Sequence, residues 1–217
     1  MKISALIIAR NEEKKIESTL KSLNFADEII VILDRTTDKT ESICKKYTKK
    51  ILKGSWKSEG ERRNFGIKNC SFTWILEVDA DEIISQDLSA EISNAIKSKS
   101  FDYYYISLVN FVGKKAIKFG WMACMAPDGK FCLFKKKKKY WLNGRVHPSY
   151  KIHGRKGKGL ENHIIHNMSE NISDLVKRFN RNTSFNAIDL AEQNIKLEKL
   201  FSIRKLVSRF LKCYISR

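Results

Sequence analysis

Apolar runs alternate with amphipathic segments along the first hundred residues of the chain. The runs are Ile3–Ala9, Glu28–Leu33, Lys50–Leu52 and Thr73–Val78. Apolar runs without polar alternation are typical of strands that are buried on both faces of a parallel sheet. Helices are expected between the runs and after the last one, over residues 12–23, 39–47, 61–70 and 86–97. The alternation therefore predicts an α/β fold with a mostly parallel sheet flanked by helices.

The pattern changes after residue 100. A longer strand is expected over Asp102–Val112, and short apolar runs follow at Phe131–Phe134 and Tyr140–Val146, separated by Gly, Pro and Lys. These runs predict mixed or antiparallel β structure. The end of the chain predicts two helical stretches, Ser173–Ala191 and the basic, amphipathic Ile195–Ile215.

Polar side chains gather where the predicted strands end. Asn11 and Glu12 follow the first strand, Asp34 ends the second, and the fourth runs into three carboxylates at Asp79, Asp81 and Glu82. The carboxyl ends of parallel strands share one edge of a sheet, where ligands bind. Carboxylates this close repel one another unless a cation lies between them. The simpler alternatives are a solvated acidic turn at a helix N-terminus and, for Asp34, a turn-initiating residue.

Composition narrows the classes of protein. The 217 residues carry a net charge of +18, which favours an anionic partner such as a nucleic acid, an acidic membrane surface or a phosphorylated substrate. The five cysteines include no CxxC pair, so a disulfide scaffold and a zinc site are disfavoured and a reduced, cytosolic chain is expected. The apolar start, Met1–Ala9, is too short for a signal peptide or a membrane span.

The ordered motifs at the strand ends resemble those of family 2 glycosyltransferases, in the branch of the lipopolysaccharide-core β-glucosyltransferases. The motifs that carry the resemblance are Ile7–Glu12, Asp34 with the turn Thr36–Thr40, Glu61–Asn64, Asp79–Glu82, Gly144–His147, Ile164–His166 and the helix Leu175–Ala187. The resemblance implies a GT-A fold. Residues 1–100 would be the nucleotide-sugar-binding half, residues 101–170 the acceptor-side mixed-β half of the same domain, and residues 171–217 the C-terminal helices.

The resemblance also implies an inverting transfer from a UDP-sugar with a divalent metal, Mn²⁺ or Mg²⁺. By motif position, Ala9, Asn11 and Glu12 match the loop against the nucleoside, Asp34 the contact to the base, Arg63 a basic contact to the nucleotide, Asp79 the residue near the ribose and Asp81 the metal ligand. A hard cation held by carboxylates neutralises the charge of a departing diphosphate, which gives this assignment a physical reason.

The histidines and the general base are less well defined by the motifs. His147 and His166 fall on motif positions and are candidates to complete the metal shell, whereas His153 and His163 are expected to be ordinary surface or core residues. An inverting displacement needs a carboxylate that accepts the proton of the acceptor hydroxyl. Pro148 stands where many members of the branch carry Glu, which leaves Asp128, Glu161 and Glu82 as candidates, although Glu82 could instead cap the following helix.

The positive charge suggests where the protein works. Lys135–Lys139 fits either a solvated hairpin tip or a contact to anionic lipid or phosphate, and Ile195–Ile215 either an interfacial helix or a helix docked on the core. The expected acceptor is a glycolipid or polysaccharide such as lipopolysaccharide core, at the cytoplasmic face of the membrane. The alternatives are a nucleotidyltransferase, which would need a Gly-rich loop after the first strand, a basic nucleic-acid-binding protein, and a transferase that has lost activity.

Overall fold

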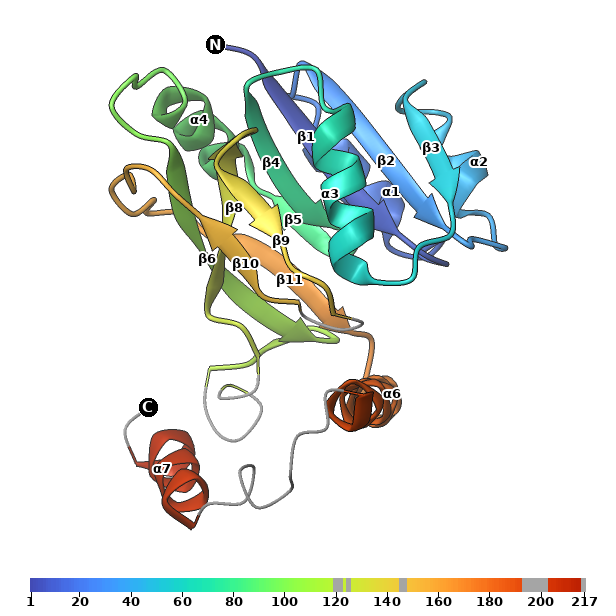
Figure 1. Cartoon of the computed structure of the whole chain (residues 1–217), viewed down its shortest axis with the longest axis vertical. Coiled ribbons are helices and arrows are strands. Elements are labelled where there is room, and N and C mark those ends of the chain that lie inside the picture. Colours follow the sequence, from blue (N-terminus) through green and yellow to red (C-terminus); the bar gives the residue numbers. More distant parts are fainter. Residues whose placement is uncertain (119–122, 124–125, 145–147, 193–202, 216–217) are drawn as a thin grey trace. The chain divides into compact units, whose positions relative to one another are not determined.

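The computed structural model describes residues 1–118, 123, 126–144, 148–192 and 203–215. The chain divides into two compact units (Figure 1). The larger unit contains residues 1–108 and 129–166, and the smaller contains residues 109–128 and 167–217. Two strands, β6 and β11, begin in the larger unit and end in the smaller one.

The elements of the larger unit follow the predicted alternation. In chain order they are β1 (Ile3–Ala9), α1 (Ile16–Ser22), β2 (Glu28–Asp34), α2 (Thr40–Cys44), β3 (Ile51–Gly54), α3 (Glu59–Asn69), β4 (Trp74–Asp79), β5 (Glu82–Ile84), α4 (Gln86–Ala95), β6 (Tyr103–Val112), β8 (Gly129–Lys135), β9 (Lys139–Trp141), β10 (Tyr150–Ile152) and β11 (Ile164–Ser169). The smaller unit adds β7 (Lys115–Ala116), α6 (Ile172–Glu192) and α7 (Ile203–Tyr214).

Most strands of the described residues form one mixed sheet in the order β3-β2-β1-β4-β8-β6-β11-β5, in which β7 also pairs with β6, whereas β9 and β10 form a separate antiparallel pair. The first four strands are parallel, whereas β8 is antiparallel to both β4 and β6. The chain places β2 and β3 on one side of β1 and then returns to place β4 on the other side. The carboxyl ends of β1 and β4 therefore meet at a topological switch point, where open α/β sheets bind ligands. The α/β prediction is confirmed.

Both faces of β1, β2 and β4 are mostly buried, which explains why their sequences are largely apolar, whereas the edge strand β3 is partly exposed. Alternate residues of β1 point to opposite faces. Ile7 belongs to a core that α1, α2 and α4 complete, whereas Leu6 belongs to a second core with Ile67 of α3 and Phe134 of β8 (Figure 1). The sheet is thus fixed from both sides, and its strand ends hold their side chains in defined positions.

The positions at which α4 and α1 begin correct two predictions. The cap of α4 is Ser85, whose side chain accepts a hydrogen bond from the backbone N–H of Leu88, so the proposed capping role of Glu82 is wrong. Glu82 begins the short strand β5 instead, and the acidic cluster is therefore not a solvated turn at a helix N-terminus. The first helix begins at Ile16 rather than Glu12, because residues 12–15 form a turn in which the Glu12 carbonyl accepts from the N–H of Lys15.

The lysine run Lys135–Lys139 is mostly used inside the larger unit. Lys139 is buried, and its ammonium lies 2.5 Å from Glu77 Oε2 of β4. Lys136 donates to the carbonyl of Cys70 at 2.6 Å, and Lys135 donates to Asp102 at 3.1 Å. A solvated hairpin tip is therefore a correct description only of Lys137, which is exposed.

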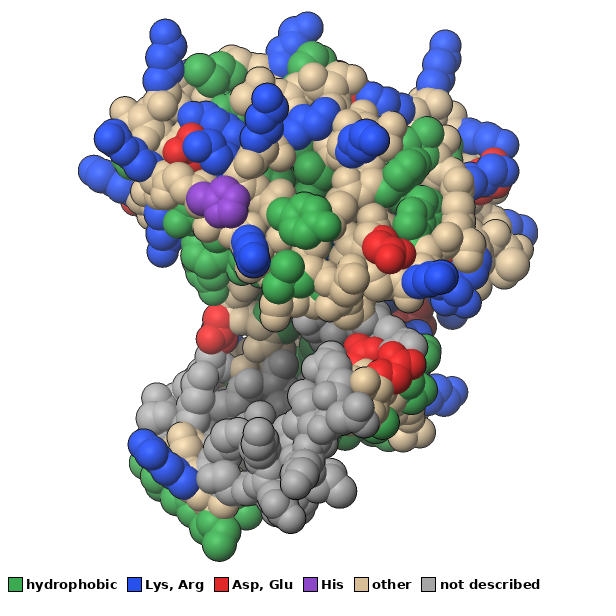
Figure 2. Space-filling model, in the orientation of Figure 1, with side chains coloured by type: hydrophobic (Ala, Val, Ile, Leu, Met, Phe, Trp, Pro, Cys, Tyr) green, Lys and Arg blue, Asp and Glu red, His purple; other side chains and the backbone are tan. Residues whose placement is uncertain are grey.

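The helices of the smaller unit expose apolar side chains. Val176 and Phe179 of α6 are exposed, as are Leu206, Val207 and Phe210 of α7. Among the described helices, none combines the length and the apolar character that crossing a bilayer requires. On the larger unit, Lys and Arg side chains are spread over the face drawn in Figure 2, with acidic side chains scattered between them.

Candidate active site

The loops that follow β1 and β2 are tied together by hydrogen bonds. The side chain of Asn11 accepts from the backbone N–H of Thr37 at 2.8 Å, and the N–H of Glu12 donates to Thr40 Oγ1 at 2.8 Å. Asn11 has a φ of 54°, in the left-handed region that Asn tolerates better than most residues. The loop that the sequence assigned to the nucleoside is therefore held beside the loop that follows Asp34.

Asp34 lies at the end of β2 and is only 3% exposed. Its carboxylate accepts two hydrogen bonds from Arg35, at 2.9 and 3.0 Å, and one from Arg62 of α3 at 2.9 Å. Burial has the largest single effect on the pKa of Asp34 and raises it, but the bond from Arg35 and the charge of Arg62 outweigh it and lower the pKa overall. Asp34 is therefore an ionised hydrogen-bond acceptor at the predicted edge.

Two buried polar atoms near Asp34 lack a hydrogen-bond partner. In the described part of the chain, the buried side-chain atoms without a partner are Thr36 Oγ1, Arg62 Nε, Trp74 Nε1 and Ser169 Oγ. Two of them belong to the turn after Asp34 and to the arginine that contacts it. Because buried polar groups are normally hydrogen-bonded, this concentration points to a polar ligand at the end of β2.

Asp79, the last residue of β4, is held by basic side chains from two different elements. Its Oδ1 accepts from Arg63 Nη2 of α3 at 3.0 Å, and its Oδ2 from Lys130 Nζ of β8 at 3.1 Å. Burial has the largest effect on the pKa of Asp79 and raises it, but the charges of Lys130 and Arg63 together hold the pKa well below its usual range.

Glu82 completes this cluster. It is 1% exposed, and its Oε2 accepts from Lys130 Nζ at 2.5 Å and from the N–H of Asp79 at 2.8 Å. Burial raises the pKa of Glu82 to about 7; the charge of Asp79 adds to the rise, and Lys130 opposes it. Lys130 thus lies between two of the three carboxylates of the motif and balances part of their negative charge.

Asp81 lies next to a histidine on a neighbouring strand. His166 Nε2 of β11 is 3.6 Å from Asp81 Oδ1, and His166 pairs with Glu82 in the antiparallel register of β11 and β5. The turn that carries Asp81 is fixed because Thr19 Oγ1 of α1 donates to the carbonyl of Ala80 at 2.9 Å. The structure therefore brings together Asp79, Asp81, Glu82 and His166, whereas His147 lies outside the described residues.

The remaining candidates for the general base are Asp128 and Glu161. Asp128 is in the smaller unit, directly before β8. Glu161 is exposed, and its backbone N–H donates to Glu91 of α4 at 2.7 Å. Pro148, at the motif position of the expected Glu, is buried.

Arg63 is fixed by a tryptophan that the sequence did not single out as part of the site. Its guanidinium lies 4.8 Å from the ring centre of Trp141 in β9. Trp141 Nε1 donates to Glu77 at 2.8 Å, and the side chain of Asn64 both accepts from and donates to the Trp141 backbone. Trp141 therefore connects α3 and β9 to the carboxyl end of β4.

Two other residues of the site, Lys130 and Arg62, also escaped the sequence analysis. Lys130 follows Asp128 by two positions in an unremarkable stretch, and only the pairing of β8 with β4 brings it to Asp79. Arg62 immediately precedes Arg63, and helical geometry directs these neighbours to different partners, Asp34 and Asp79. The two adjacent arginines in the sequence were the sign that Arg62 could also belong to the site.

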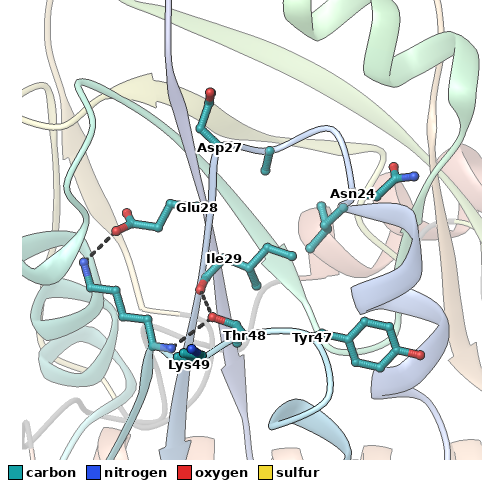
Figure 3. A pocket seen from close by; sticks show the side chains of 10 residues that line it. Asn24, Asp27, Glu28, Ile29, Tyr47, Thr48 and Lys49 are labelled. Atoms are coloured by element: carbon teal, nitrogen blue, oxygen red, sulfur yellow. Dashed lines mark hydrogen bonds and ion pairs between the residues drawn. The ribbon is translucent and has the colours of Figure 1, made fainter.

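A hollow of about 490 Å³ lies at the opposite end of β2 (Figure 3). Its wall includes Glu28, which accepts hydrogen bonds from Ser4, Lys50 and Ser71 at 2.6 Å each. These bonds tie the beginning of β2 to β1, to the residue before β3 and to the segment before β4. We interpret this end of the sheet as structural, because its charged groups bind one another.

Comparisons with known proteins agree with this geometry. An uncharacterized glycosyltransferase of Rickettsia typhi is 29% identical over 231 aligned residues, which cover 100% of this chain and 77% of that protein. A second one, from Rickettsia bellii, is 38% identical over 104 residues, covering 48% of this chain and 35% of that protein. The lipopolysaccharide core biosynthesis glycosyltransferase LpsC of Rhizobium meliloti is 28% identical over 91 residues, covering 40% of this chain and 34% of that protein.

A solved structure supports the fold. The crystal structure of Staphylococcus aureus TarS 1–349 superposes with a TM-score of 0.50 at 22% identity, covering 63% of this chain and 47% of that one. Residues 4–157 match the sequence profile described as Glycosyl transferase family 2. The matched region contains the parallel strands, Asp34 and the acidic cluster at the end of β4, and the chain therefore belongs to glycosyl transferase family 2.

Proposed function

We propose that this glycosyltransferase is inverting and metal-dependent, and that it transfers a sugar from a UDP-sugar to a phosphorylated glycolipid or saccharide acceptor. The observation that carries the proposal is the convergence, at one sheet edge, of the Asn11–Glu12 loop, Asp34 and the acidic end of β4. Charged and polar groups that meet at a topological switch point are suited to a nucleotide and its diphosphate.

The nucleoside would lie over the ends of β1 and β2. Ala9 and the Asn11–Glu12 loop would form its floor, and Asp34 would accept a hydrogen bond from a base N–H. The unpartnered Thr36 Oγ1 and Arg62 Nε support this placement, since both could bond a nucleotide. Arg63 would act through Asp79, which faces the ribose in this arrangement.

A divalent metal fits the donor atoms at the end of β4. Asp81 and His166 would hold it, with His147 as a further candidate, and no group of three His, Cys, Asp or Glu suited to a metal occurs among the described residues. Mg²⁺ is commonly bound by one or two carboxylates together with substrate phosphates, so two protein ligands would be enough for a site of this kind. When bound, the metal would neutralise charge on the departing diphosphate.

The names of relatives support an anionic acceptor. LpsC takes part in lipopolysaccharide core biosynthesis, and TarS, 28% identical over 126 residues, is a poly(ribitol-phosphate) β-N-acetylglucosaminyltransferase. The net charge of +18 would attract acceptors of this kind. The same charge, with α7, would place the enzyme peripherally at the inner face of the membrane. Family membership disfavours the alternative of a nucleic-acid-binding protein.

The test is calorimetric binding of nucleotide sugars with and without Mn²⁺, together with a transfer assay. We expect the wild type to bind a UDP-sugar more tightly with Mn²⁺, and Asp81→Ala to lose this enhancement and most of the transfer. Asp87→Asn in the exposed first turn of α4 is the control, because Asp87 lies outside the proposed site. Full Mn²⁺-dependent activity in Asp81→Ala would contradict the metal assignment, and a folded wild type without transfer would indicate a degenerate enzyme.

A further inference from the structure

Lys130 reduces the negative charge at the end of β4, where the diphosphate of the proposed donor would bind. None of the sequence motifs includes Lys130. Its side chain is 23% exposed, and its ammonium contacts Asp79 Oδ2 at 3.1 Å and Glu82 Oε2 at 2.5 Å. Glu82 is almost fully buried and Asp79 about one-third exposed, so the three groups reach from the core to the surface of the site.

The negative charge of the carboxylates at the end of β4 is greater than Arg63 alone can balance. Arg63 is the other basic partner of Asp79, but the same Nη2 also lies 2.7 Å from Glu59. One guanidinium is therefore shared between two carboxylates. Without Lys130, Asp79, Asp81 and Glu82 would present excess negative charge to the diphosphate, which is itself an anion.

We propose that Lys130 is a positioning residue for the donor, which acts by neutralising Asp79 and Glu82 so that the diphosphate can approach Asp81. This inference rests on the proposed function, because it assumes that the donor diphosphate binds at the end of β4. This role differs from that of a metal ion, because the positive charge of Lys130 is part of the chain and is present before any ligand binds.

A covalently attached cation also restricts where a metal can bind. Both oxygens of Asp79 and one oxygen of Glu82 are hydrogen-bonded to basic side chains or backbone. A divalent ion would have to displace Lys130 from Asp79 Oδ2 and Glu82 Oε2, and Arg63 from Asp79 Oδ1, to use them. If a metal binds, Asp81 and His166 are therefore the residues that would hold it, and the metal would supply positive charge to the donor diphosphate.

The experiment measures the Kd of UDP-sugars by calorimetry, with and without Mn²⁺, in the full chain. Lys130→Met should bind the donor at least roughly tenfold more weakly, which corresponds to about 1.4 kcal/mol. Mn²⁺ should improve binding by a larger factor in this variant than in the wild type, because the metal then has more negative charge to offset. Lys130→Arg should restore most of the affinity.

Lys50→Met is the matched control. Lys50 forms an ion pair of similar length with Glu28, 2.6 Å, at the opposite end of the sheet. This variant loses an ion pair in which Lys50 is 36% exposed and Glu28 13% exposed, without touching the site, so its donor Kd should equal that of the wild type. Thermal melts of both variants report any general loss of folding.

The double variant Glu82→Gln with Lys130→Met separates charge balance from structure. Measured at a pH well above the pKa of Glu82, which is about 7, the double variant lacks one charge of each sign, so its donor Kd should lie within about threefold of the wild-type value. This comparison also serves if Lys130→Met alone does not fold. A folded double variant that binds tenfold more weakly, or a folded Lys130→Met with unchanged Kd, would overturn the assignment. A wild type that binds no nucleotide sugar would instead contradict the proposed function.

Discussion

At the scale of single residues, the site depends on pairs of opposite charge that different elements bring together. Asp34 meets Arg62 across 28 positions, and Asp79 meets Lys130 across 51. Each carboxylate was visible in the sequence because it ends an apolar run. Lys130 was not, because a lysine in a strand carries no signal until the strand pairing is known, and Arg62 was visible only as the neighbour of Arg63 in a predicted helix.

The proton acceptor gives a prediction at this scale. Glu82 is engaged by Lys130, which leaves Asp128 and Glu161 as the proposed bases. In Asp128→Asn and Glu161→Gln, the variant that lacks the base should lose at least a hundredfold in kcat while its donor Kd stays unchanged. Rates and calorimetry are measured on both. If both variants keep wild-type kcat, neither residue is the base.

Glu28 gives a prediction of pH dependence. Burial raises the pKa of Glu28, but bonds from Lys50, Ser4 and Ser71 outweigh burial and lower the pKa from 4.5 to about 2. The folded state therefore binds its proton less readily than the unfolded state. The resulting stability is fully present above pH 4.5 and is lost as the pH falls towards 2.

The measurement is urea unfolding of the wild type and Glu28→Gln at pH 7 and pH 3. The difference between the two proteins at pH 7 should be of the order of 3 kcal/mol, since one pKa unit corresponds to about 1.4 kcal/mol, and it should shrink at pH 3. Asp87→Asn in the exposed first turn of α4 serves as the control. A pH-independent difference would show that Glu28 contributes through packing alone.

At the scale of elements, long periodic segments were predicted well and short ones were missed. The four apolar runs became β1 to β4, and α4 lies within its predicted segment. The strands β5 and β10 have three residues each, too few for a periodic pattern. β10 pairs with the nearby β9, whereas β5 pairs with β11, which is far away in the chain. Because β5 carries Glu82 and pairs with His166, missing it concealed part of the site.

The proposed membrane contact is tested through α7. Its exposed apolar residues alternate with Arg204, Lys205, Arg209 and Lys212 in the sequence, a pattern typical of helices that bind anionic surfaces. We expect the chain to sediment with vesicles that contain phosphatidylglycerol, less so at high salt, and hardly at all with phosphatidylcholine alone. Phe210→Ser should reduce this binding severalfold.

Val176→Ser is the matched control for the vesicle experiment. Val176 of α6 and Phe210 of α7 are equally exposed, at 59%. A general loss of surface hydrophobicity would affect both variants, whereas a contact through α7 would affect only Phe210→Ser. Equal binding of all three proteins to anionic vesicles would contradict the role of α7.

At the scale of the whole molecule, the compact units do not follow the order of the chain. The larger unit takes residues 129–166 back to the sheet formed by the first hundred residues, after an excursion of twenty residues into the smaller unit. The sequence pattern indicated a change of structure after residue 100, which the antiparallel strands explain. It could not indicate that β8 inserts beside β4, because that pairing depends on long-range packing.

The position of β8 has a consequence for how the protein emerges from the ribosome. When the first hundred residues have been synthesised, β4 still lacks its neighbour, and Asp79 and Glu82 still lack Lys130. The nascent sheet would then have an open edge and an unbalanced acidic end. The pairing of β4 with β8 and the neutralisation of the ligand-binding end are therefore one event, which waits for residue 130 and its strand to be translated, and β11 joins the sheet later still.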